Sequence, residues 1–258
     1  MTDTNRPLLL LSNDDGFQAK GIQCLIELLR PMADLVVVAP DGPRSGSSAA
    51  ITSDRPVSVK CLADEEGMKL YSCSGTPTDC VKLALHALTP RRPDMVVGGI
   101  NHGDNSSVNV HYSGTMGVVI EGCLKGIPSV GFSLCDHDAD ADFAPAGPYI
   151  RRIVSEVLEK GLPKGTCLNV NFPNVACLKG IRICRQTDGV WVQEYEPCAH
   201  PRGGAYFWLT GSYRNDEPDA ADSDHWALEH DYVAVTPTRI DMTDYEQMKR
   251  MASWNLHV

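Results

Sequence analysis

The sequence lacks any apolar run that approaches the roughly 20 residues needed to cross a bilayer as a helix. Its first apolar run, the leucines at 8–11, is also far shorter than the apolar region of a secretory leader. We therefore expect a protein of the cytoplasm that does not act at a membrane.

Positive charge is also scarce. The 258 residues carry 23 Lys and Arg against 33 Asp and Glu, a formal net charge of −10. Proteins that hold DNA or RNA gain much of their affinity from a basic face that neutralises phosphates. Polymeric nucleic acid is therefore not an expected partner, whereas one small phosphate ester in a local site remains compatible with this charge.

No two cysteines are spaced as Cys-x-x-Cys, although the chain has ten. Zinc sites and redox motifs commonly use that spacing. In a chain of this length without a secretory leader, scattered cysteines are typical of reduced, buried thiols. We expect neither a disulfide framework nor a zinc site.

Short apolar runs alternate with helical patterns over the first two-thirds of the chain. Strands that are apolar on both faces and separated by helices form parallel sheets covered on both sides. We therefore predict a doubly wound α/β fold with a mostly parallel, Rossmann-like sheet. The expected strands are 8–11, 35–38, 57–59, 70–71, 95–97 and 130–132, and the expected helices are 22–29, 76–88, 114–125 and 150–158.

The pattern changes after about residue 167. Residues 1–258 are expected to form one domain, with a core over about 7–165 and a C-terminal β-hairpin and helix extension over about 166–258. The expected elements of the extension are strands at 168–170, 181–183, 190–192, 206–209 and 232–235 and a helix at 244–251. Because the apolar residues 206–209 are hard to bury in a sheet already flanked by helices, we expect them at the interface of a homo-oligomer.

Polar residues follow the first two predicted strands. Asp14 and Asp15 come directly after the first, and two adjacent carboxylates repel unless one is protonated or a divalent cation lies beside them. A helix cap or Asx turn is the alternative. The second strand leads into residues 39–48, which are rich in hydroxyl groups and taken alone resemble a flexible surface loop. Ligands bind beyond the carboxyl ends of parallel strands, where both segments are expected.

The predicted strand 95–97 leads to Asn101 and later to a helix that begins at Ser113-Gly114-Thr115. Unpaired N–H groups and the positive end of the helix dipole favour phosphate at such a position. Gly114 has no Cβ, so a phosphate oxygen can approach the backbone, and Thr115 offers a hydroxyl. Ser113 as a plain helix cap is the alternative.

Three strand ends on one edge thus bring together carboxylates, hydroxyls, an amide and an anion-binding helix start. Oxygen ligands of this kind suit Mg²⁺ or Mn²⁺. A cation beside a phosphate site indicates phosphoryl chemistry. His102 and His111 are left without a role, because histidines in loops form hydrogen bonds more often than they bind metals.

Four blocks carry a resemblance to a known family: Leu11-Ser12-Asn13-Asp14-Asp15-Gly16, Arg44-Ser45-Gly46-Ser47-Ser48, Gly75-Thr76-Pro77-Thr78-Asp79-Cys80, and Gly99-Ile100-Asn101 with Tyr112-Ser113-Gly114-Thr115. They resemble the signature motifs of the SurE survival-protein family, which are metal-dependent 5′/3′-nucleotidases. The match is dense over residues 8–133 and sparser over 201–209 and 233–237.

The resemblance implies a binding site for one divalent cation per subunit, Mg²⁺ or Mn²⁺. Its implied ligands are Asp14, Asp15, Ser45 and Asn101. The implied phosphate site consists of Asn105, Ser113, Gly114 and Thr115. Homodimers or homotetramers built through C-terminal segments are also implied. A glycine and an aspartate that commonly follow the Asn105 position are Ser107 and Asn109 here, which puts the geometry of this loop in question.

We expect a phosphohydrolase that acts on nucleoside 5′-monophosphates, with 3′-monophosphates and short polyphosphate as further candidate substrates. Asp14 and Asp15 are the catalytic candidates, and attack by a metal-activated water is favoured over covalent attack by a carboxylate. The helix start at 113–115 would stabilise charge on the transferring group. Two alternatives are a phosphatase with an aspartyl nucleophile, whose usual Asp-x-Asp spacing is missing here, and a nucleotide-binding sensor without turnover.

Overall fold

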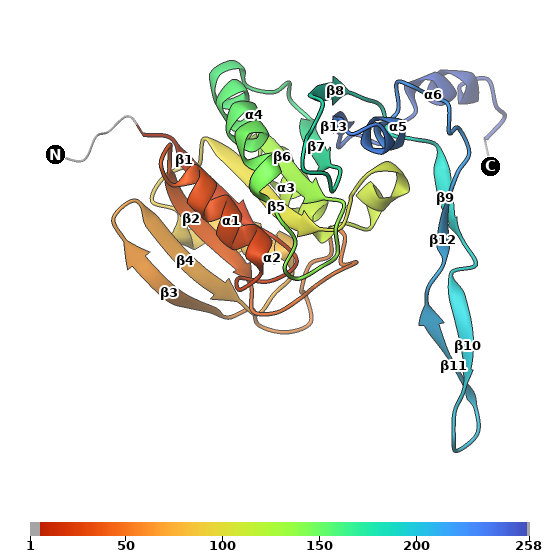
Figure 1. Cartoon of the computed structure of the whole chain (residues 1–258), viewed down its shortest axis with the longest axis horizontal. Helices are drawn as coiled ribbons and strands as arrows, with labels where there is room; N and C mark the ends of the chain where they lie inside the picture. Colours follow the sequence, from red (N-terminus) through yellow and green to blue (C-terminus); the bar gives the residue numbers. More distant parts are fainter. Residues whose placement is uncertain (1–5, 257–258) are drawn as a thin grey trace.

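The computed structural model describes residues 6–256. At its centre lies a nine-stranded sheet with the order β3-β4-β2-β1-β5-β6-β7-β13-β8 (Figure 1). The strands from β4 to β7 in this order are parallel to one another. The strands of the sheet are β1 (Leu8–Ser12), β2 (Asp34–Pro40), β3 (Val59–Glu65), β4 (Met68–Cys73), β5 (Met95–His102), β6 (Ser129–Leu134), β7 (Thr166–Phe172), β8 (Ile181–Ile183) and β13 (Val233–Arg239). The predicted doubly wound, mostly parallel fold is confirmed.

Helices cover both faces of this sheet, and β1 shows how. Leu9 and Leu11 pack with α1 and α4 on one face, whereas Leu8 and Leu10 pack with α2 and α3 on the other. Because successive strand residues point to opposite faces, an unbroken apolar strand requires two covered faces. The helices are α1 (Lys20–Leu29), α2 (Pro77–Leu83), α3 (Gly114–Leu124), α4 (Gly147–Lys160), α5 (Asp224–Glu229) and α6 (Tyr245–Met251).

Two predicted elements differ from the structure. The strand expected at 57–59 is β3, which begins only at Val59 and is largely exposed. The helix expected over 76–88 begins as predicted, with reciprocal hydrogen bonds between Thr76 and Asp79, but α2 ends at Leu83. It continues as a π-helical turn, Ala84–Leu88, in which the Thr89 N–H donates to the Ala84 carbonyl at 3.0 Å.

The C-terminal part extends the sheet and then leaves it. The strand β13 lies between β7, to which it is antiparallel, and β8, to which it is parallel. Between β8 and α5 the chain forms two antiparallel pairs, β9 with β12 and β10 with β11, which project away from the sheet in Figure 1. We call residues 189–215 the arm. Its strands are β9 (Gly189–Val192), β10 (Tyr195–Ala199), β11 (Ala205–Leu209) and β12 (Ser212–Asn215).

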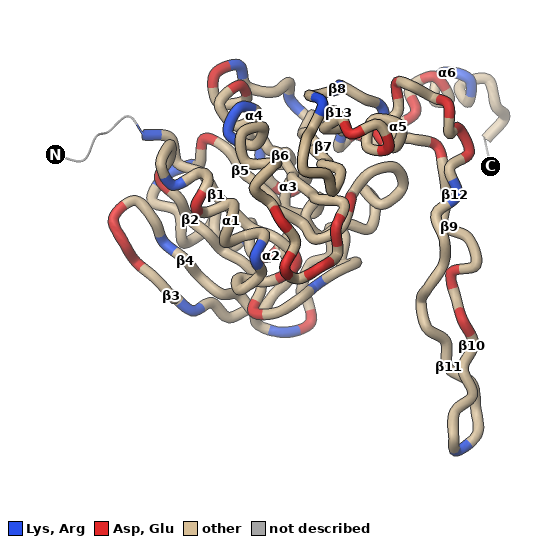
Figure 2. Tube along the Cα trace, in the orientation of Figure 1, with Lys and Arg blue, Asp and Glu red and all other residues tan. Residues whose placement is uncertain are grey.

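Apolar side chains of the arm are exposed in the single chain. Phe207, Trp208 and Leu209 keep 59%, 65% and 68% of their surface accessible. Figure 2 shows Lys and Arg dispersed over the described residues rather than gathered on one face. Between residues 6 and 256, no helix combines the length and apolar character that a membrane crossing demands.

Candidate active site

Parallel pairing brings the ends of β1, β2 and β5 to one edge of the sheet. In the register of β1 and β5, Ser12 lies beside Gly98. Asp14 and Asp15 follow β1, and Asn101 lies near the end of β5. The loop after β2 joins them, because the Arg44 N–H donates to the Asp14 carbonyl at 2.7 Å. Three segments that are distant in the sequence therefore meet here.

Asp14 is buried, with 4% of its surface exposed. Its Oδ1 accepts a hydrogen bond of 2.6 Å from the Thr115 hydroxyl, and its carboxylate also accepts from the Gly114 N–H. Burial raises the pKa of Asp14 to about 6, with a smaller contribution from the charge of Asp15, while the bond from Thr115 acts in the opposite direction. The side chain thus connects the end of β1 to the start of α3.

Asp15 is more accessible and faces the other way. Its Oδ2 accepts from the backbone N–H of His102 at 3.3 Å. Burial raises the pKa of Asp15, and this hydrogen bond together with the nearby imidazoles of His102 and His137 lowers it. The two carboxylates of the pair therefore have different surroundings.

Asn101 has its amide nitrogen already engaged, because Nδ2 donates to the Gly103 carbonyl at 2.7 Å. The amide oxygen is the atom left for a ligand. Ser45 lies on the exposed loop after β2. That loop is held to the segment before α3 by the Ser48 N–H, which donates to the Tyr112 carbonyl, and by the Ser48 hydroxyl, which donates to the His111 carbonyl.

The start of α3 corrects one expectation. Thr115 was expected to offer its hydroxyl to a phosphate oxygen, but that hydroxyl donates to Asp14. Gly114 packs directly against Asp14 as well, because a Cβ there would lie 2.6 Å from the Asp14 Cβ and 2.8 Å from the Ser47 hydroxyl. Ser113 caps the helix by accepting from the Met116 N–H at 2.9 Å. The backbone at this helix start remains the natural place for an anion.

Asn105 is buried behind the same edge. Its Nδ2 donates to the Ser133 hydroxyl at 2.8 Å, and its backbone bonds to two asparagines of β7: its N–H donates to Asn171 Oδ1 and its carbonyl accepts from Asn169 Nδ2. Both bonds are 2.7 Å long. The structure therefore fixes the position of Asn105 firmly and leaves its amide oxygen available.

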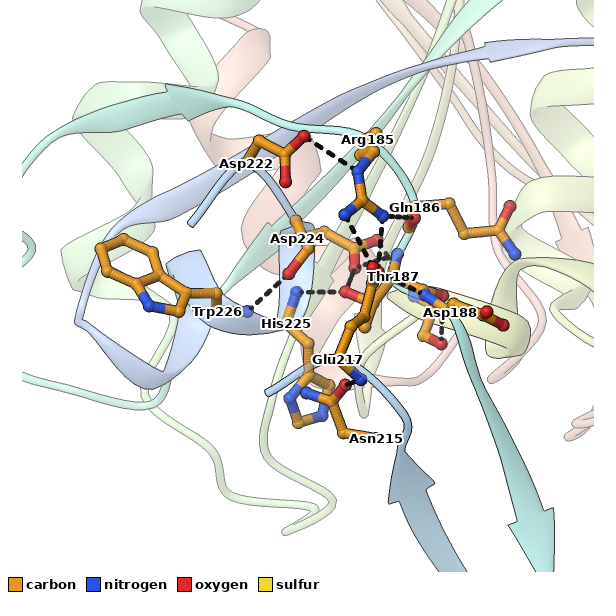
Figure 3. Close-up of polar contacts among 12 residues, drawn as sticks. Arg185, Gln186, Thr187, Asp188, Asn215, Glu217, Asp222, Asp224, His225 and Trp226 are labelled. Carbon is orange, nitrogen blue, oxygen red and sulfur yellow. Dashed lines mark hydrogen bonds and ion pairs between the residues drawn. The ribbon is translucent and has the colours of Figure 1, made fainter. Parts of the chain in front are cut away.

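Four residues at or beside the arm hold the loop between Asn105 and α3, which the sequence did not reveal. We call Thr187, Trp191, Tyr213 and Asp224 the base of the arm. Buried Asp224 accepts from the Thr187 hydroxyl at 2.6 Å (Figure 3). It also accepts from the Ser107 N–H at 3.0 Å. The Tyr213 hydroxyl donates to the Ser107 hydroxyl at 2.6 Å. In the structure Ser223 caps α5 by accepting from the Trp226 N–H.

Asn109, the second departure from the family pattern, is used in the same way. Its Oδ1 accepts from the Trp191 indole N–H at 2.7 Å, and its Nδ2 donates to Asp104 Oδ1 at 3.3 Å. Both residues that put the loop geometry in question thus bind residues at the base of the arm.

His102 has a structural role. The Gly21 N–H donates to its Nε2 at 3.3 Å, and its Nδ1 lies 2.9 Å from the Asp138 carbonyl. Because a carbonyl can only accept, Nδ1 carries the proton. The ring joins the start of α1 to the loop after β6, and His111 contributes its carbonyl to Ser48.

Oxygen donors dominate this edge. The described residues hold no group of three or more His, Cys, Asp or Glu that could bind a metal, so a cation here would need amide or hydroxyl ligands beside the two carboxylates. The buried Ser47 hydroxyl and Asn13 Oδ1 have no hydrogen-bond partner within the described chain. Such a set of hard oxygen donors fits Mg²⁺ or Mn²⁺ and does not fit zinc.

Comparisons with known proteins agree with these motifs. The family model described as survival protein SurE matches residues 9–193. A protein of Phocaeicola vulgatus named 5′-nucleotidase SurE is 66% identical over 98% of both chains, and one of the same name from Bacteroides fragilis is 58% identical over 98% of this chain and 100% of its own. The crystal structure of the SurE protein from Aquifex aeolicus superimposes with a TM-score of 0.82 at 34% identity, covering 95% of this chain and 98% of that one. The chain belongs to the SurE survival-protein family.

Proposed function

We propose that this chain removes phosphate from nucleoside 5′-monophosphates with the help of one divalent cation. The relatives named 5′-nucleotidase support the reaction class. The observation that carries the proposal is the position of Asp14, which adjoins Asp15 and also binds Thr115 at the start of α3. A cation site and an anion site therefore share one buried side chain.

The residues that would hold the cation are Asp14, Asp15, Ser45 and Asn101. When bound, Mg²⁺ or Mn²⁺ would polarise the ester phosphate and orient a water. Thr115 fixes the Asp14 carboxylate through its hydroxyl. The Gly114 and Met116 N–H groups are taken by Asp14 and Ser113, so the Thr115 N–H is the donor left at the start of α3 for a phosphate oxygen as charge develops on it. Ser113 and Asn105 keep this helix start and its loop in place.

Water is the preferred nucleophile. Its oxygen forms the new bond to phosphorus while the bond from phosphorus to the nucleoside oxygen breaks. The proton that Asp15 takes from the water passes to that oxygen, so the nucleoside leaves as an alcohol. Asp15 is the more accessible carboxylate and accepts the proton of the attacking water. Asp14 is buried and already accepts a hydrogen bond from Thr115, so its carboxylate stays in place during the reaction.

Phosphate release from a panel of nucleotides tests this proposal. The chelated protein should be inactive, and added Mn²⁺ or Mg²⁺ should restore release from 5′-monophosphates. The panel includes 3′-monophosphates and tripolyphosphate, because both are further candidate substrates. Nucleotide binding without release under any metal would favour the alternative of a sensor with no turnover.

We also propose that the protein is a homodimer or homotetramer assembled through the arm and α6. Exposed apolar groups on both segments support this, among them Trp208 at 65% and Met248 at 54% exposure. Light scattering at micromolar concentration should give a multiple of the 28.1 kDa chain mass. A monomer would contradict the proposal.

A further inference from the structure

A groove of about 640 Å³ opens beside Asp15. It lies on the side of the sheet that α1 covers, whereas α3 covers the opposite face. The candidate cation site therefore has the start of α3 on one side and this groove on the other. Cavities of roughly 300–1,000 Å³ are typical of small-molecule sites.

The walls of the groove are fixed to one another. The Lys20 ammonium donates to the Asp140 carbonyl at 2.7 Å, which ties the start of α1 to the loop after β6. His102 bridges the same two segments. The ring of His137 packs on Gly103, where a Cβ would lie 2.2 Å from the His137 Cε1. A ligand would thus find its site already formed.

Polar groups line the groove. Gln23 donates through Nε2 to the Phe17 carbonyl at 2.6 Å, which leaves its amide oxygen as an acceptor. Gln18 is exposed at the rim, and His137 offers an imidazole beside it. Such groups can hydrogen-bond the hydroxyls of a sugar or the edge of a base.

The loop after β6 is acidic. It places aspartates at every second position from 136 to 142, and Asp140 lines the groove. These aspartates outnumber the Lys20 ammonium that also lines the groove, and an excess of negative charge repels a second anion more strongly than it affects a neutral group.

We infer that this groove holds the nucleoside of the substrate and selects a neutral leaving group over a phosphorylated one. The inference rests on the proposed function. It assigns phosphate to the start of α3, the nucleoside to the groove, and the reacting bond to the space beside Asp14 and Asp15. Polyphosphate should consequently be a much poorer substrate than a nucleoside monophosphate.

Filling the groove tests the assignment. Ala139 is exposed and lines it, so Ala139→Trp should obstruct the nucleoside while leaving the phosphate site untouched. We expect the KM for 5′-AMP to rise about tenfold or more, which corresponds to about 1.4 kcal/mol of lost binding. Inhibition by inorganic phosphate should be unchanged. The matched control is Ala176→Trp, an exposed alanine outside the groove, which should change neither value.

The outcomes separate this inference from the proposed function. An unchanged KM for 5′-AMP in Ala139→Trp would overturn the inference, and so would an equal rise in the inhibition constant of phosphate. A parent chain that releases no phosphate would overturn the proposed function alone. Calorimetric titration of adenosine into the parent and into Ala139→Trp would still decide whether the groove binds a nucleoside.

A charge reversal tests selectivity. Asp140→Lys should raise the kcat/KM for tripolyphosphate relative to 5′-AMP by about threefold to tenfold, because it replaces repulsion by attraction at the groove. Asp219→Lys makes the same change in an exposed loop outside the groove and should leave the ratio unaltered. Equal ratios in the two variants would overturn the selectivity part of the inference.

Discussion

Two regions of the molecule differ in how far their side chains find partners within the chain. One is the edge where the parallel strands β1, β2 and β5 end, and the other is the arm. At the edge, polar residues such as Asp14 and Asn105 are buried and bonded within the chain. Along the arm, apolar residues such as Trp208 are exposed and find no cover in the single chain. Most polar groups of the edge are therefore bonded within one chain, apart from the Ser47 hydroxyl and Asn13 Oδ1, whereas the arm leaves apolar surface uncovered. Ser107 and Asn109 join the two regions.

The largest effect should come from the edge. Asp15→Asn removes a charge from the candidate cation site and should slow phosphate release by about a hundredfold or more, as for other lost electrostatic contacts in active sites. Thermal melting should change little, because Asp15 is only partly buried. Asp219→Asn is the control. Parental activity in Asp15→Asn without added metal would rule out the cation site.

A methyl group at the edge should have the next largest effect. Gly114→Ala places a Cβ against Asp14, so this carboxylate must move, and we expect a loss of about 1–3 kcal/mol in unfolding free energy. Activity should fall with it, because Asp14 serves both sites. In Gly42→Ala the new Cβ meets nothing within 4 Å, which makes it the matched control. Urea unfolding and phosphate release measure both, and equal results in the two variants would contradict the tight contact.

Asp224→Asn breaks the junction between the regions. The carboxylate accepts bonds from Ser107 and Thr187, and bonds to charged acceptors contribute about 1.5–3 kcal/mol each, so we expect unfolding free energy to fall by about 2 kcal/mol. Turnover should fall several-fold because the loop before α3 loosens. Asp222→Asn changes an exposed acid nearby and should have little effect. Turnover at the parental level would show that the junction does not support the site.

Introducing positive charges into the arm should change the oligomeric state and nothing else. Tyr206→Lys with Trp208→Lys places two ammonium groups in the exposed β11 strand, and light scattering should shift to the mass of one chain. Unfolding free energy of the monomer should change by no more than about 0.5 kcal/mol, as for other surface substitutions. Activity lost together with assembly would mean that the candidate site needs the second chain in order to act.

The smallest effect concerns pH. Burial acts to raise the pKa of Asp79, but hydrogen bonds from Thr52 and Thr76 outweigh it and hold the pKa below its usual value. A lowered pKa stabilises the folded state above the unfolded value of about 3.9 and loses this contribution as pH falls through the folded value. Asp79→Asn should therefore weaken the decline of stability as the pH falls below about 4. Urea unfolding measures it, with exposed Asp54→Asn as control.

The sequence predicted those features of the fold that depend on one short segment of the chain. Four consecutive leucines required two covered faces, and Thr76 with Asp79 predicted the start of α2. The position of β13 between β7 and β8 was beyond reach, because strand order depends on pairing between segments about 60 residues apart.

For the candidate site, too, local motifs were predictive, whereas contacts between distant segments were not predicted. Motifs at strand ends predicted that Asp14, Asp15 and Asn101 would meet, since parallel strands align their carboxyl ends. Residue type did not reveal that Thr115 would donate to Asp14, or that Asp224 would hold Ser107. Each of those hydrogen bonds depends on which residue the fold places beside the hydroxyl or the carboxylate. From the sequence alone, either group could bond to many different neighbours.

The position of β13 also sets an order for synthesis. Residues 233–239 complete the sheet by pairing with both β7 and β8. A ribosome-bound chain that has not yet extruded them presents β7 as an open edge, and such an edge pairs readily with other chains. The arm must therefore be synthesised before the sheet can close. Nascent chains whose extruded part ends between residues 173 and 232 should be those that aggregate or recruit a chaperone.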